Sequence, residues 1–212
     1  MKENFFRRPA TTTEWMADGL RAAAVLGVLV AALVFTPTDV GIVALASPAV
    51  MLPRILGMRA GFDLAHGAIV LTAAWSNVFG LYTSVPRWDL AVHMLCTGVL
   101  SVIAYVCLAR ADVLPDLRGG VVRRRIPAFV VPIIALAISA LWEMLEWAGW
   151  RYISDEIYVA YQDTIGDMIL GALGGVVAGM LVAVVRVERV DETSHARAAL
   201  PADQPRRHVA LE

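Results

Sequence analysis

Six ionisable side chains occur as three closely spaced pairs, and each pair lies at one end of a long apolar run. They are Asp89 and His93, Glu143 and Glu146, and Asp163 and Asp167. On a helix, residues three or four positions apart share one face, with their Cβ atoms ~5–6 Å apart. Placing an ionisable group near hydrocarbon costs roughly 2.5–3.5 kcal/mol on insertion scales, so such residues indicate a functional site.

Five carboxylates around one histidine need compensation for their charge, and three arrangements would supply it. A divalent metal ion is the first, because carboxylate with imidazole suits Mn, Zn or Fe, and carboxylate with water suits Mg. Protonation of some carboxyls is the second, which is the condition for acid–base chemistry or a proton relay. Pairing with Arg87 and Arg151 in a purely structural network is the third. The sequence leaves all three open.

The positions of these pairs depend on apolar segments that are long enough to cross a bilayer. Of the 212 residues, 58% are hydrophobic and 17% are charged, whereas a soluble domain is nearer to about half apolar and about a quarter charged. The apolar residues gather in six runs near the ~20 residues that a transmembrane helix needs. These runs are about 20–37, 39–58, 62–82, 89–109, 127–149 and 163–187. The second is the weakest, because Pro48 and Pro53 interrupt it. We therefore predict an all-α bundle of six transmembrane helices over residues 20–187, placed in a lipid bilayer.

The basic residues predict the orientation of the bundle. With the N-terminus in the cytoplasm, all but two of the 18 Lys and Arg residues fall on the cytoplasmic side, the exceptions being Arg87 and Arg151. The connecting loops are short enough for the positive-inside rule to apply. Both termini are therefore expected in the cytoplasm. Residues 1–19 would form a cytoplasmic or interfacial lead, and the polar residues 188–212 a disordered tail.

This orientation brings the three pairs to one level of the bilayer. The fourth and sixth spans begin outside and the fifth ends there, so each presents its pair just inside the outer boundary. Four tryptophans bracket the same zone, as an interfacial aromatic belt does. They are Trp88, Trp142, Trp147 and Trp150. We therefore predict one acidic, His-containing pocket that opens to the extracytoplasmic side.

The metal hypothesis assigns a role to each residue of this pocket. The predicted ligands of a divalent Zn, Mn or Mg ion are His93, Glu146, Asp163 and Asp167. The predicted acid–base or supporting groups are Asp89 and Glu143. The sequence has no nucleophilic Ser or Cys motif, phosphate loop or nucleotide fingerprint, which disfavours soluble-cofactor chemistry. No nucleic-acid partner is expected.

Two further features have mainly structural explanations. Asp63 lies in the first turn of the third run, where the helix dipole stabilises a carboxylate. Gly171, Gly175 and Gly179 share one face of the sixth run, and small residues allow helices to approach closely in lipid. Packing within the bundle is favoured for this face over the alternative, a homodimer interface.

The paired positions resemble the YjdF-like family of bacterial inner-membrane proteins, which is related to the broader VanZ-like group. The similar stretches are 88–93 with Gly98, 142–147 and 162–168, and they occur in the family's order. Residues 158–161 stand where the family has a longer Gly- and Asp-bearing lead. The resemblance implies a compact helical protein of the bacterial cytoplasmic membrane. The VanZ-like relation implies an association with glycopeptide resistance and envelope processes.

Together, these features predict metal-assisted or acid–base chemistry on a lipid-linked envelope substrate or another small-molecule ligand. The alternatives are proton- or ion-coupled transport and a purely structural polar network. Six spans without a pair of broken helices leave little room for alternating access, which disfavours transport.

Overall fold

The computed structural model describes residues 2–117, 121–153, 157 and 159–189. Apart from the isolated bridge between Met58 and Glu188, the regular structure of these residues is helical. The helices are α1 (Lys2–Phe6), α2 (Thr12–Val34), α3 (Pro37–Leu56), α4 (Ala60–Val78), α5 (Leu81–Ser84), α6 (Trp88–Arg110), α7 (Val121–Tyr152) and α8 (Tyr161–Val184). The predicted all-α fold is confirmed.

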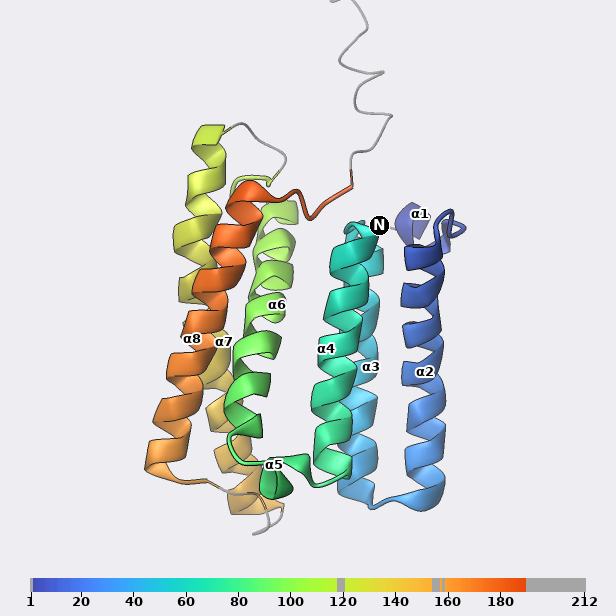
Figure 1. The fold of residues 1–212 in the computed structure, drawn as a ribbon, viewed down its shortest axis with the longest axis vertical. Helices are drawn as coiled ribbons and strands as arrows, with labels where there is room; N and C mark the ends of the chain where they lie inside the picture. The colour runs from blue at the N-terminus through green and yellow to red at the C-terminus, as the bar shows by residue number, and fades with distance from the viewer. Residues whose placement is uncertain (1, 118–120, 154–156, 158, 190–212) are drawn as a thin grey trace, which may run out of the picture.

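The six long helices form two groups of three that stand side by side (Figure 1). Helices α2, α3 and α4 pack against one another, and α6, α7 and α8 form the second group. Contacts of α6 with α3, α4 and α5 join the groups. Successive long helices run in opposite directions, so α6 and α8 begin at the end of the molecule where α7 ends (Figure 1).

Five of the described helices are long and apolar enough to cross a membrane. These segments are Thr12–Val34, Pro37–Leu56, Trp88–Arg110, Arg125–Tyr152 and Tyr161–Val184. Helix α4 is not among them, because Asp63, His66 and Asn77 lower its hydropathy. It nevertheless lies alongside α2 and α3.

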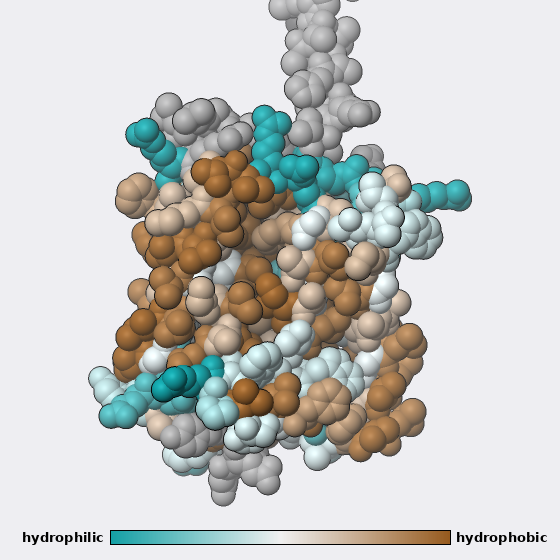
Figure 2. Space-filling view, in the orientation of Figure 1, coloured by the Kyte–Doolittle hydropathy of each residue, from teal (hydrophilic) through white to brown (hydrophobic). Residues whose placement is uncertain are grey.

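The outer surface of the bundle is largely apolar between its two ends. Figure 2 shows hydrophobic side chains over the middle of one face, with hydrophilic side chains gathered towards the ends. Large apolar side chains such as Leu33 and Phe129 are 85% and 76% exposed. A surface of this kind is suited to lipid, because a soluble monomer rarely exposes such a large apolar area.

Helix α3 runs without a break through Pro48 and Pro53. Its start is well defined, because Thr36 and Asp39 form a capping box and Pro37 occupies the first turn. Prolines are tolerated in transmembrane helices, where neighbouring groups can satisfy the freed carbonyls. The two prolines therefore do not divide the second predicted span.

The glycine face of α8 packs against α7 within the same chain. A Cβ on Gly175 would lie 2.2 Å from the Ala135 Cβ, and one on Gly179 would lie 3.0 Å from the Pro127 carbonyl oxygen. Gly171 meets Ser139 in the same way. Close packing inside the bundle accounts for these three glycines, and the homodimer remains a prediction.

The described ends of the chain contact the first group of helices. Helix α2 begins at Thr12, inside the segment 1–19 that was assigned to the lead, because the Thr11 hydroxyl accepts a hydrogen bond from the Glu14 amide and caps the helix. Residues 186–189 run past the turn between α3 and α4, where the Arg59 amide donates to the Val187 carbonyl at 2.7 Å. The remainder of the predicted tail, 190–212, lies outside the described residues.

Candidate functional site

The three predicted pairs lie at the same end of the α6–α8 group. Asp89 and His93 belong to the first turns of α6, and Asp163 and Asp167 to the first turns of α8. Glu143 and Glu146 lie near the end of α7. The antiparallel order of the three helices therefore brings the pairs to a common level (Figure 1).

His93 stands between two carboxylates that come from different helices. Its Nδ1 atom lies 3.8 Å from Glu143 Oε1, and its Nε2 atom lies 3.7 Å from Asp167 Oδ2. Both distances exceed that of a normal hydrogen bond. Each of the three residues offers one ligand atom, and these atoms all lie within 4.8 Å of one another. A cation between the three side chains could therefore be held by nitrogen and oxygen together.

Two carboxylate oxygens of this group are buried without a hydrogen-bond partner among the described residues. They are Glu143 Oε1 and Asp167 Oδ1, on residues that are 8% and 3% exposed. Burying an ionised carboxylate without a partner is strongly unfavourable. A cation or a proton would supply the partner that these two oxygens lack among the described residues.

A second acidic group shares Asp167 with the first. One carboxylate oxygen from each of Asp89, Asp163 and Asp167 lies within 4.8 Å of the others. Asp89 and Asp163 are only partly buried, and they line a groove together with Arg87, Tyr161 and Gln162. The second group thus lies between the buried carboxylates of the first group and the surface.

Glu146 lies outside both groups. Its Oε1 atom accepts a hydrogen bond from the Trp142 indole nitrogen at 2.8 Å, one turn earlier on α7. In the described residues Glu143, the other member of the pair, is the one that lies beside His93. The assignment of Glu146 as a metal ligand remains a prediction, without support from this geometry.

Two facing rows of residues, one on α7 and one on α8, explain why Glu143 and not Glu146 lies beside His93. On α7, buried residues recur every four positions, namely Val131, Ala135, Ser139 and Glu143. On α8, the facing residues also recur every four positions, namely Gly179, Gly175, Gly171 and Asp167. Glu143 and Asp167 are the last residues of these two rows, and they lie close together at the end of the bundle. This fourfold spacing is visible in the sequence and would have favoured Glu143.

Neither Arg87 nor Arg151 forms an ion pair with these carboxylates in the part of the chain that the structure describes. The Arg151 guanidinium lies over the Tyr152 ring, 5.4 Å from its centre. Arg87 is exposed, and its backbone has a φ of 62° at the start of α6. The predicted structural network therefore lacks its basic partners among the described residues.

A second charged cluster at the opposite end of the molecule was not recognised from the sequence. Arg21 on α2 forms a buried ion pair with Asp63 on α4, and its Nη1 atom lies 2.5 Å from Asp18 Oδ1. Asp63 is therefore held by an arginine as well as by its place at the start of a helix. The signal was available, because Arg21 and Asp63 both lie in apolar runs at the same predicted boundary.

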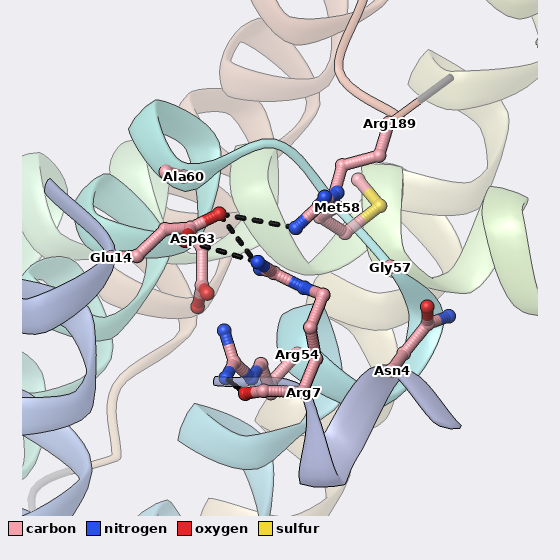
Figure 3. A pocket seen from close by; sticks show the side chains of 9 residues that line it. All are labelled: Asn4, Arg7, Glu14, Arg54, Gly57, Met58, Ala60, Asp63 and Arg189. Atoms are coloured by element: carbon pink, nitrogen blue, oxygen red, sulfur yellow. Dashed lines mark hydrogen bonds and ion pairs between the residues drawn. The ribbon is translucent and has the colours of Figure 1, made fainter. Parts of the chain in front are cut away.

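The remaining charges of this cluster are also paired. Figure 3 shows Arg7 and Arg189 directed at the Glu14 carboxylate, with distances of 2.7 Å and 3.1 Å. Arg54 Nη2 donates to the Arg7 carbonyl oxygen and lies 3.7 Å from Asp18 Oδ2. In this cluster each carboxylate faces an arginine, so the contacts are sufficient to explain it as a structural connection between the chain ends and α2–α4.

The sequence was compared with models of known protein families, with curated proteins and with solved structures. Residues 19–188 match the family model described as "Predicted membrane protein (DUF2238)", which covers α2 from Gly19 onwards and the other five long helices in full. The chain belongs to the DUF2238 family. DUF2238 is the YjdF-like family, so that resemblance is confirmed, whereas the relation to the VanZ-like group remains a prediction. DUF2238 membership agrees with the apolar helices in showing a membrane protein. No curated protein and no solved structure matches the chain significantly.

Proposed function

We propose that this protein binds a divalent cation between His93, Glu143 and Asp167 and uses it for metal-assisted chemistry on a lipid-linked envelope substrate. The observation that carries the proposal is that both carboxylates beside the His93 imidazole, those of Glu143 and Asp167, bear a buried oxygen without a hydrogen-bond partner among the described residues. A cation bound to one ring nitrogen of His93 and to an oxygen of each carboxylate would compensate the charge of both buried carboxylates. One imidazole with two carboxylates suits Zn or Mn.

We further propose that the bundle has six spans in the bacterial cytoplasmic membrane, with both termini in the cytoplasm. Helix α4 has 19 residues, which at 1.5 Å per residue gives about 28 Å and is close to the hydrocarbon thickness. Its charged residue Asp63 is paired with Arg21, which reduces the cost of burial. The start of α2 and the end of α8 lie at the same end of the molecule (Figure 1), as an even number of spans requires.

In this orientation the groove beside Asp89 and Asp163 opens to the extracytoplasmic side. A bound divalent cation would supply an activated water and polarise a substrate oxygen. Asp89 and Asp163 lie between this position and the groove, where either could accept or donate a proton. Substrate would enter from the outer leaflet, because the groove is formed at the outer ends of α6 and α8.

The position of the site within one group of helices favours a catalytic site that does not move over a transport site with alternating access. All of its residues lie within α6, α7 and α8, which form one of the two groups of helices. Transporters usually bind substrate and coupling ions at the interface of their moving halves. Proton- or ion-coupled transport is the competing outcome, and cation-dependent uptake by reconstituted vesicles would favour it.

Metal analysis of the detergent-purified protein tests the proposal. The wild type should retain a stoichiometric divalent metal after gel filtration or take up Mn²⁺ in a binding titration. His93→Ala and Glu143→Gln should each weaken Mn²⁺ binding by at least about tenfold, because each removes one ligand. Glu146→Gln is the matched control, since it changes the same charge on the same helix outside both groups. Equal losses in Glu143→Gln and Glu146→Gln, or no binding by the wild type, would contradict the proposal.

A further inference from the structure

Asp167 is the residue that belongs to both acidic groups. It shares the first with His93 and Glu143 and the second with Asp89 and Asp163. One of its oxygens, Oδ2, lies 3.7 Å from His93 Nε2. The other, Oδ1, is buried and has no hydrogen-bond partner among the described residues. The two oxygens of this single carboxylate are thus both available to ligands.

We propose that Asp167 bridges two divalent cations, the first held with His93 and Glu143 and the second with Asp89 and Asp163. This inference deepens the proposed function and rests on it for the first cation. A carboxylate has two oxygens with about four lone-pair sites and can serve two ions. Paired metal ions in enzymes lie ~3.5–4 Å apart and hold the attacking and leaving oxygens of a displacement together.

The formal charge of the site favours two cations over one. The four carboxylates of the two groups, Asp89, Glu143, Asp163 and Asp167, contribute −4 when ionised, and no described arginine pairs with them. One divalent cation would leave −2, whereas two would leave no net charge. At the other end of the molecule, by contrast, Arg7, Arg21 and Arg189 supply the compensating charge.

The two cation positions differ in chemistry and in access. The inner position includes an imidazole, and the His93 side chain is only 11% exposed, so a borderline ion such as Zn²⁺ or Mn²⁺ suits it. The outer position offers oxygen atoms only, and Asp89 and Asp163 are partly exposed in the groove. Such a site suits Mg²⁺ or Mn²⁺ and would keep water molecules as further ligands. The outer cation is therefore the weaker one and the one that meets the substrate.

Mn²⁺ is the probe that tests both positions in the full-length, detergent-purified protein. Equilibrium titration of the wild type should show two Mn²⁺ per chain, and the electron paramagnetic resonance spectrum at saturation should show exchange-coupled ions. Asp89→Asn/Asp163→Asn should retain one Mn²⁺ with an uncoupled six-line spectrum. Asp167→Asn should weaken both binding steps at least about tenfold, and Glu146→Gln should behave as the wild type does.

The outcomes separate this inference from the proposed function. A wild type that binds one Mn²⁺, lost in His93→Ala, overturns the bridged pair and leaves the single-cation proposal standing. Two Mn²⁺ that are unaffected by Asp89→Asn/Asp163→Asn overturn the assignment of the second position. No binding by the wild type overturns both. Asp89 and Asp163 are partly exposed, so their variants should fold, as monodisperse gel filtration would verify.

Discussion

Ser139 on α7 lies directly against Gly171 on α8, where a Cβ on the glycine would be 2.6 Å from the Ser139 Oγ atom. The same Oγ donates a hydrogen bond to the backbone carbonyl oxygen of Asp167 at 3.3 Å. The hydroxyl therefore connects the close helix crossing to the residue that bears the central carboxylate. The distance between Glu143 and Asp167 depends on this contact, which lies one helical turn away from both.

We expect Gly171→Ala to destabilise the protein by about 1–3 kcal/mol, because the added methyl group overpacks the α7–α8 contact. Moving α8 away from α7 should also weaken Mn²⁺ binding. The measurements are thermal unfolding in detergent and the Mn²⁺ titration.

Gly19→Ala is the matched control for this substitution. Gly19 lies in α2 with open space around its Cβ position, and replacing a helical glycine by alanine favours the helix by roughly 0.5–1 kcal/mol. A similar response in the two variants would show that the close crossing does not position the site.

Much of the fold could be predicted from the sequence, because in lipid the length of an apolar run nearly determines the helix. The level of the three pairs followed from the same runs. The sequence did not show which face of α7 points towards His93, because either Glu143 or Glu146 could lie on that face near the polar end of the helix. The row of residues spaced by four through Ala135 and Ser139 identifies this face only when it is compared with the glycines spaced by four on α8.

The Arg21–Asp63 pair could not be derived from either helix alone. Each residue has a local explanation, Asp63 in the first turn of its helix and Arg21 near the predicted cytoplasmic boundary. Their contact joins residues 42 positions apart, and it depends on how α2 and α4 pack. Side-chain pairing across helices is therefore the part of this structure that sequence patterns left undetermined.

We expect Arg21→Met to destabilise the protein by about 3–5 kcal/mol, because it leaves the Asp63 carboxylate buried without its main partner. Arg21→Met/Asp63→Leu should recover most of the loss, since replacing both charges by apolar groups removes the uncompensated charge. Thermal unfolding in detergent measures both effects. A double variant as unstable as Arg21→Met would show that the pair has a role beyond mutual compensation. Mn²⁺ binding should be retained, because the site lies at the opposite end of the bundle.

The proposed six-span topology predicts which loops are accessible from outside the cell. In a background with Cys96 and Cys107 replaced by Ala, Thr38→Cys and Thr83→Cys should react with a membrane-impermeant thiol reagent in intact cells. Asp112→Cys should react only after the membrane is opened. Thr38 lies at the start of α3 and Thr83 in α5, so these two positions flank the α3–α4 hairpin. If α4 does not cross the membrane, Thr38→Cys and Thr83→Cys will differ in their accessibility.

Asp167→Asn distinguishes a cation site from a structural polar network, because the two predict opposite changes in melting temperature when divalent cations are absent. Without divalent cations, in EDTA, the variant should melt at a higher temperature than the wild type, because a buried carboxylate with an unpartnered oxygen is removed. With saturating Mn²⁺ the order should reverse, because ligand binding to the native state stabilises the wild type more than a variant whose binding is weakened. At 100 times the dissociation constant this stabilisation is about 2.7 kcal/mol. A network held by the carboxylate itself predicts a lower melting temperature for Asp167→Asn in both conditions, so a pair of melting curves distinguishes the two explanations.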